Sequence, residues 1–118
     1  MKNCFFGSYR QNSTGIYLIL AQFAFQLNGD ARYISPAIMR TTNNSSYSIV
    51  SSTDVFIRQT SSLTTWNAGF VSCTLDITNV TTHKVRFDVE SSANVSTATR
   101  GTTTSDLTAF TFIRIGDT

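Results

Sequence analysis

The longest apolar run in the chain covers residues 15–27 (GIYLILAQFAFQL) and is apolar at both of its alternating sets of positions. One set is uninterrupted, namely Tyr17, Ile19, Ala21, Phe23, Phe25 and Leu27. The other consists of Ile16, Leu18, Leu20, Gln22, Ala24 and Gln26. An ordinary half-exposed strand has one polar face, so this run needs a cover on each side. The core supplies one cover, and the second has to be another sheet, another subunit or a bound surface.

A helix and a secretory signal sequence are the competing interpretations of residues 15–27. Aromatic and β-branched residues within the run, and turn-forming residues at both of its ends, favour a strand over a helix. Lys2 precedes the run, as in a signal peptide, but two glutamines interrupt it and no small-residue cleavage site follows. We therefore predict a strand, and the run is too short and too interrupted to cross a membrane as a helix.

Short segments separated by polar turns predict the remaining strands. In the clearest segment, 83–91, apolar residues alternate with charged ones. Pro36 lacks the amide hydrogen that a ladder needs, so its strand is expected at a sheet edge or with a bulge. The predicted strands cover residues 3–6, 15–27, 31–40, 47–50, 54–59 (separate from 47–50 or one bent strand with it), 68–78, 83–91, 94–98 and 107–115. Their spacing of about ten residues predicts a β-sandwich or barrel.

The composition also predicts an all-β fold. The chain has 15 serines and 19 threonines among 118 residues, but one glutamate and two lysines. Threonine favours strands and serine favours turns. The length suits a single domain, 1–118, with 1–14 as an N-terminal arm or edge strand and 15–118 as the sandwich. A net charge of +2 with scattered arginines argues against direct nucleic-acid binding.

We expect no catalytic, cofactor-binding or metal site, and no enzyme activity. His83 is the sole histidine, Glu90 is the sole glutamate, and no Gly-x-Ser-x-Gly motif occurs. Cys73 is in phase with the apolar positions of its strand, which predicts a buried thiol. A disulfide between Cys4 and Cys73 is the open alternative.

Several segments resemble the tumour necrosis factor and complement globular-head superfamily. The run at 15–27 is similar to the family's inner strand, which begins Gly-aliphatic-Tyr and often carries a glutamine. Three later segments resemble later strands in the same order, namely ARYISPAIMR (31–40), FVSCTLDITNVTTHKVRFDVESS (70–92) and LTAFTFIRIGD (107–117). The chain departs from the family at 79–82, where a Gly-Asp turn is absent, and before residue 15, where the first strand pair is mostly missing.

This resemblance implies an antiparallel jelly-roll β-sandwich that assembles as a homotrimer. By the resemblance, Leu18, Leu20 and Gln22 would face the threefold axis. Phe110 and Phe112 are further candidates for the trimer interface. The alternative for these two phenylalanines is that they cap an open end of the sandwich within one subunit.

The high serine and threonine content and the closing segment also look similar to bacteriophage virion proteins with this fold. We therefore expect a structural protein of the virion, namely a trimeric capsid decoration or cement protein on the capsid surface. Its partners would be the major capsid protein or other virion subunits, with no membrane involved. The initiator methionine close to the domain start favours this free-standing trimer over a stalked fibre tip.

A receptor- or glycan-binding tip domain of a tail fibre is the alternative function. The loops at 41–46, 61–67 and 92–106 would then contact the host surface. Tyr47 and Trp66 are the residues best suited to stack on a ligand. A structural alternative for Trp66 is a loop anchor packed on the end of the sandwich.

Overall fold

A computed structural model describes the backbone of residues 2–92 and 97–118, and the side chains from residue 7 onward within these ranges. Every regular element in the described residues is a β-strand, which confirms the all-β prediction. The strands are β1 (Lys2–Tyr9), β2 (Gly15–Leu27), β3 (Ala31–Thr41), β4 (Ser48–Ser52), β5 (Val55–Ile57), β6 (Thr65–Ile77), β7 (Lys84–Ser91), β8 (Ala98–Thr99) and β9 (Ala109–Gly116).

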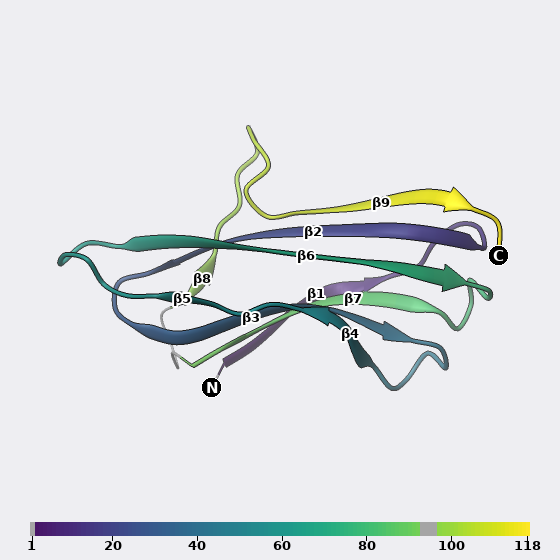
Figure 1. Cartoon of the computed structure of the whole chain (residues 1–118), viewed down its shortest axis with the longest axis horizontal. Coiled ribbons are helices and arrows are strands. Elements are labelled where there is room, and N and C mark those ends of the chain that lie inside the picture. Colours follow the sequence, from purple (N-terminus) through teal and green to yellow (C-terminus); the bar gives the residue numbers. More distant parts are fainter. Residues whose placement is uncertain (1, 93–96) are drawn as a thin grey trace.

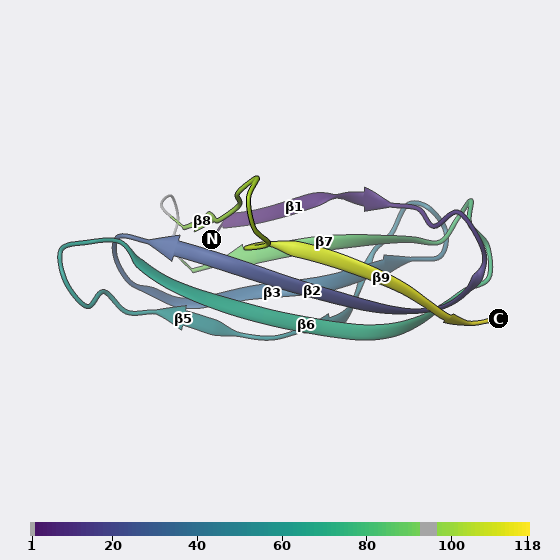
Figure 2. The same ribbon diagram turned by 90° about the horizontal axis from the view of Figure 1, so that it is seen from above.

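The strands form two antiparallel sheets that lie one above the other in an elongated sandwich (Figure 1). Sheet A has the order β1-β7-β3-β4, and β5 also pairs with β3. Sheet B has β2 at its centre, with β6 along one side and β8 and β9 along the other. Viewed from above, β9, β2 and β6 run side by side across sheet A (Figure 2). The sandwich predicted from strand spacing is therefore confirmed.

Strand β2 occupies residues 15–27, as predicted, and the helix interpretation is wrong. Its burial alternates residue by residue, with the Tyr17 to Leu27 set buried and the Ile16 to Gln26 set half-buried or exposed. It pairs with β6 along its whole length, from Gly15 opposite Ile77 to Leu27 opposite Thr65. Because paired residues in an antiparallel sheet share a face, this register also fixes which side chains of β6 point inward.

The core lies between the two sheets, and an aromatic cluster fills it beneath β9. Phe87 of β7 is fully buried, and its ring stacks on Phe110 with centroids 3.9 Å apart and planes at 3°. Tyr9 contacts this pair from β1, with its ring centroid 5.6 Å from that of Phe87 and 6.2 Å from that of Phe110. These rings connect β1, β7 and β9, so they close one long side of the sandwich.

Most differences from the predicted strands are shifts of their ends. Strand β6 begins at Thr65, so Trp66 lies on a strand and not in a loop. The segments 47–50 and 54–59 correspond to two separate short strands, β4 and β5. The weak strand predicted at 94–98 falls mostly outside the described residues, and β8 follows it at Ala98–Thr99.

Of the two alternatives predicted for Pro36, the sheet edge is wrong, because β3 is an interior strand of sheet A. Irregular pairing does occur on both sides of Pro36, where the register of β3 shifts between Ala31 and Ile34 and between Ile38 and Met39. The neighbour of β3 is also interrupted, since β4 ends at Ser52 and β5 begins at Val55. The ladder therefore breaks where the missing amide hydrogen would be needed, and the Pro36 carbonyl accepts a hydrogen bond from the Thr53 amide (3.3 Å). Across the core, a Cβ on Gly69 would lie 3.0 Å from Pro36 Cγ, so the glycine lets the sheets approach.

We expect Phe87→Ala to lower the free energy of unfolding by about 3–5 kcal/mol, because it empties the centre of the aromatic cluster. Phe56→Ala is the matched control, since Phe56 is 63% exposed and its loss opens no comparable cavity. Urea denaturation of both variants measures the difference. Equal midpoints for the two variants would contradict the packing described here.

Candidate functional site: the outer face of sheet B

The outer faces of the two sheets differ in chemistry. On sheet A, the outward positions of β7 are charged, namely Lys84, Arg86, Asp88 and Glu90. On sheet B, register places the following residues outward: Ile16, Leu18, Leu20, Gln22, Ala24 and Gln26 on β2, Trp66, Ala68, Phe70, Ser72, Thr74 and Asp76 on β6, and Ala109, Thr111 and Ile113 on β9. Asp76 is the only charged residue in this set. Sheet B therefore presents an almost uncharged surface.

The half of this face near the start of β2 is apolar. Leu18 lies between Thr74 of β6 and Ile113 of β9, and Leu20 lies in the next row towards Phe70. Phe70 is 57% exposed and Ile113 is 43% exposed. We call Leu18, Leu20, Phe70 and Ile113 the apolar patch. Such a group of large side chains in adjacent rows is typical of a surface that another surface covers.

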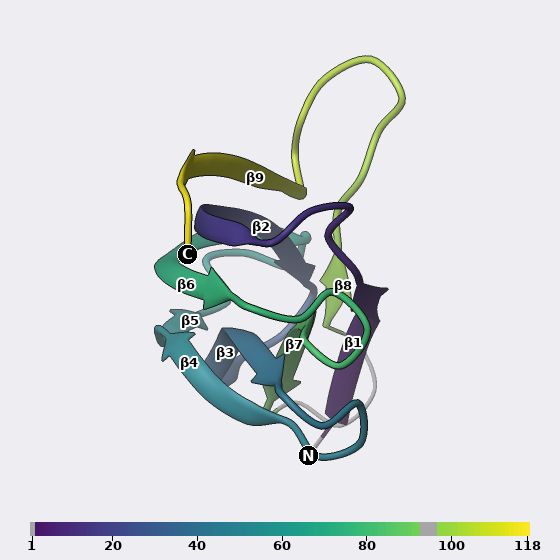
Figure 3. The same cartoon turned by 90° about the vertical axis from the view of Figure 1, so that its right-hand side faces the viewer.

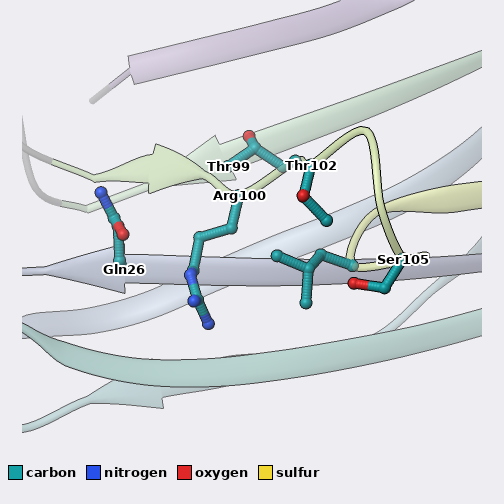
Figure 4. Close-up of a pocket in the computed structure, with 7 residues that line it drawn as sticks. Gln26, Thr99, Arg100, Thr102 and Ser105 are labelled. Carbon is teal, nitrogen blue, oxygen red and sulfur yellow. The ribbon is translucent and has the colours of Figure 1, made fainter.

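The other half of the face is hollowed beneath the connection between β8 and β9, which rises away from the sandwich (Figure 3). Two hollows meet at Arg100. The first, drawn in Figure 4, is lined by Gln26, Thr99, Arg100, Gly101, Thr102, Ser105 and Leu107. The second, which we call the Trp66 hollow, is lined by Gln22, Ala24, Trp66, Asn67, Ala68, Arg100, Asp106 and Leu107.

Hydrogen bonds hold both ends of this connection against β2. The Arg100 amide donates to the Ala24 carbonyl (2.8 Å), and the Ala24 amide donates to Thr108 Oγ1 (3.1 Å). The side-chain amide of Gln22 donates to the carbonyl oxygens of Asp106 (3.0 Å) and Leu107 (3.2 Å). The hollows are thus formed by fixed backbone at the edge of a sheet.

Leu18, Leu20 and Gln22 all lie on the outer face, in successive rows of β2. The two leucines belong to the apolar patch, whereas Gln22 is exposed and tethers the β8–β9 connection. Their predicted contact with a threefold axis stays a prediction, since it concerns an assembled form.

Phe110 and Phe112 lie on the inner side of β9. They pair with Ala21 and Ile19, which point into the core, and both are partly buried against the core cluster. Phe112 also contacts the ring of Phe87, with centroids 5.9 Å apart. This placement favours the alternative in which the two rings cap the sandwich within one subunit. Ala109, Thr111 and Ile113 are the β9 residues that face outward instead.

Tyr47 and Trp66 do not share a surface. Tyr47 is half-buried beside the outer face of sheet A, where the Arg86 guanidinium lies 4.4 Å from its ring centroid and its hydroxyl bonds Ser8 Oγ. Trp66 is 60% exposed on the outer face of sheet B. A single ligand cannot stack on both rings, and Tyr47 already has partners within the chain.

Sequence reasoning missed two outward-facing residues, Phe70 as part of the apolar patch and Arg100 as the link between the hollows. Phe70 could have been found, because Trp66, Ala68 and Phe70 form a period-two series that leads into the predicted strand. Arg100 carries no such signal, since its position depends on the backbone bond between a polar loop and Ala24.

Cys73 is a free thiol, so the alternative of a disulfide with Cys4 does not hold in this structure. It lies opposite Ile19 on the inner side of sheet B and is half-buried, slightly less than predicted. Burial raises the pKa of the Cys73 thiol above its ordinary value, and the charge of Arg40 partly offsets this effect.

Within the described residues, no group of three histidine, cysteine or acidic side chains could hold a metal ion. His83 lies in the turn before β7, and its Nδ1 is buried without a hydrogen-bond partner. In the described parts of the chain, no helix has the length and apolar character needed to cross a bilayer.

Comparison with protein-family models and with curated proteins gives no match for this sequence.

The pH dependence of Cys73 alkylation tests the environment of this thiol. In a Cys4→Ser variant, which keeps Cys73 as the single thiol, we expect iodoacetamide to react slowly in the folded state. The half-maximal rate should lie at a higher pH in the folded protein than in the unfolded chain, because burial raises the pKa of the thiol by disfavouring the thiolate. The same variant in urea should titrate near the ordinary value, and identical folded and unfolded profiles would contradict the assignment.

Proposed function

We propose that this chain is a non-enzymatic structural protein that assembles through the outer face of sheet B. The observation that carries the proposal is the contrast between the two outer faces. Sheet A presents charged residues to solvent, whereas sheet B presents Leu18, Leu20, Phe70 and Ile113. No charged residue lies in the rows of Leu18 and Leu20, as is usual for the centre of an interface.

The size of the apolar patch makes association energetically reasonable. Removing one large aliphatic or aromatic side chain from water contributes roughly 1.5–3 kcal/mol. Association also costs translational and rotational freedom, estimated at about 4–15 kcal/mol. Leu18 and Leu20 are already half-buried, so each contributes only part of its transfer energy. The burial energies of several subunits in a closed ring are therefore needed to exceed the entropic cost of association.

A homotrimer of jelly-roll subunits is the specific assembly that we propose. The support comes from the segments that resemble the tumour necrosis factor and complement globular-head superfamily, above all the strand at residues 15–27. In this arrangement Leu18 and Leu20 face the threefold axis. Phe110 and Phe112 are not included, because their rings pack into the core of their own subunit.

The biological role that we propose is decoration of a bacteriophage capsid. The support is the resemblance of the composition and of the closing strand to virion proteins with this fold. The trimer would dock on the shell through its serine- and threonine-rich loops and its N-terminal segment, and would bridge neighbouring capsid subunits. Many modest contacts, repeated over the shell, would then resist internal pressure.

We expect Leu20→Asp to convert the trimer into monomers, because three aspartates would meet at the axis without counter-charges. Sedimentation velocity should show a threefold fall in mass. Ile49→Asp is the matched control, since Ile49 is 63% exposed on sheet A and should leave the mass unchanged. Ile113→Lys is a second interface variant at a more exposed position. A soluble Leu20→Asp protein of unchanged trimeric mass would refute the axis assignment.

Copy number in purified virions tests the proposed location. A decoration protein should be present in hundreds of copies per particle, and its removal should lower the temperature at which the capsid releases DNA. Quantitative mass spectrometry against the major capsid protein and a thermal release assay provide the two measurements. A few copies per particle, with infection blocked by added free protein, would indicate a fibre tip instead.

A further inference from the structure

The Trp66 hollow combines an exposed aromatic ring with an arginine and an aspartate that form no ion pair with any described residue. Trp66 is the only tryptophan, and 60% of its surface is exposed although it lies on a strand. Its backbone is fixed by pairing with Gln26 in the centre of sheet B. The backbone that carries the ring is therefore held in position before any ligand arrives, which reduces the entropy lost on binding.

Arg100 stands at the boundary between the two hollows, with its side chain extended across β2 (Figure 4). Its guanidinium carbon lies 5.1 Å from the centroid of the Trp66 ring. Its amide is anchored to Ala24, so the side chain starts from a fixed point. No ion pair of Arg100 with any described residue occurs, and the guanidinium keeps its donors available.

Acceptors complete the same hollow. Asp106 is among the lining residues, and its carboxylate forms no ion pair in the described part of the chain. Gln22 uses its amide nitrogen for the loop, which leaves its side-chain oxygen as an acceptor. One positive and one negative residue therefore line the hollow, and their formal charges cancel.

From this geometry we infer that the Trp66 hollow binds a neutral saccharide. A sugar ring has one face of C–H groups, which packs on an aromatic ring, and a rim of hydroxyls, each both donor and acceptor. Trp66, with Ala24, Ala68 and Leu107 around it, supplies the apolar floor. Arg100 supplies donors, and Asp106 and Gln22 supply acceptors. Small-molecule sites commonly combine an apolar, aromatic lining with a few convergent polar groups.

The charge distribution argues against a nucleic acid in the same place. Single-stranded nucleic acids need a positively charged groove that follows the backbone. Here one arginine stands beside one aspartate, and the neighbouring residues of the first hollow are neutral, namely Gln26, Thr99, Thr102 and Ser105. Hydroxyl and amide groups of this kind extend the saccharide site and do not create a phosphate track.

The saccharide site does not depend on the proposed assembly. Leu18 and Gln26 are eight positions apart on β2, which corresponds to roughly 26 Å along an extended strand. The far ends of the apolar patch and of the Trp66 hollow are therefore well separated, although the two adjoin where Phe70 pairs with Gln22. A trimer centred on Leu18 can leave the Trp66 end of the hollow open, and a monomer would keep the hollow as well.

The indole N–H of Trp66 gives a direct readout, because the chain has no other tryptophan. The protein labelled with ¹⁵N is titrated with the methyl glycosides of glucose, galactose, mannose and N-acetylglucosamine at tens-of-millimolar concentrations. We expect a saturable shift of the indole resonance with at least one of these probes. Arg100→Ala and Asp106→Asn should each weaken binding of that probe about tenfold or more, because each removes charge-assisted hydrogen bonds.

Arg58→Ala is the matched control, because Arg58 is an exposed arginine outside both hollows and should leave the affinity unchanged. Sodium glucuronate and a thymidine decanucleotide are tested in parallel. Saturable binding of either one, without binding of a neutral glycoside, would overturn the proposal. So would the absence of an indole shift with all four glycosides. Equal weakening by Arg58→Ala and Arg100→Ala would overturn the assignment of Arg100.

Discussion

The structure depends on β2 being buried on one face and flanked by other strands along both of its edges. Its inner residues, from Tyr17 to Leu27, form a continuous apolar line that needs the whole length of sheet A beneath it. Its hydrogen-bonding groups are met by β6 on one side and by β8 and β9 on the other. A strand of this length and hydrophobicity at a sheet edge would invite pairing with other chains. The central position removes that hazard.

The central position of β2 also creates the distinctive surface. Since the inner face takes every second residue, Leu18 and Leu20 must point outward, and the register brings Phe70 and Ile113 beside them. Neighbouring strands add serine, threonine and alanine to this face, with Asp76 as the one charge at its end. Sheet A keeps lysine, arginine, aspartate and glutamate on its outside. The two outer faces therefore differ in kind, since one is charged and the other carries large apolar side chains.

Period-two alternation made much of the fold predictable. The buried faces of β2 and β7 can be predicted from the alternation alone. In β7, for example, Val85, Phe87 and Val89 are in phase, so only that side of the strand can be buried. The faces of β9 were harder, since both are apolar. Leu107, Ala109 and Ile113 alternate with Phe110 and Phe112, and local pattern cannot decide which set turns inward. The stacking of Phe110 on Phe87 decides it, and that contact joins residues far apart in sequence.

Pro36 and Trp66 show why the remaining features could not be predicted. Pro36 signals a missing ladder bond, but the sequence does not say which strand adapts, and here the neighbour breaks into β4 and β5. Trp66 looked like a loop residue because its inward neighbours, Thr65 and Asn67, are polar. Its pairing with Gln26 places it on a strand of sheet B. Its neighbour Arg100 begins the connection between β8 and β9, and the sequence does not indicate where such a polar loop lies.

A division of this single face into two halves follows from the same register. At the start of β2, the flanking strands β6 and β9 both contribute outward side chains, so the surface is flat and apolar. At the end of β2, β9 is absent and only the two residues of β8 remain, so the polar connection arches over the sheet and leaves hollows beneath it. Flatness suits contact with another protein subunit, and a hollow beside an exposed indole suits a small ring. The lengths of β8 and β9 therefore determine where each kind of contact can form.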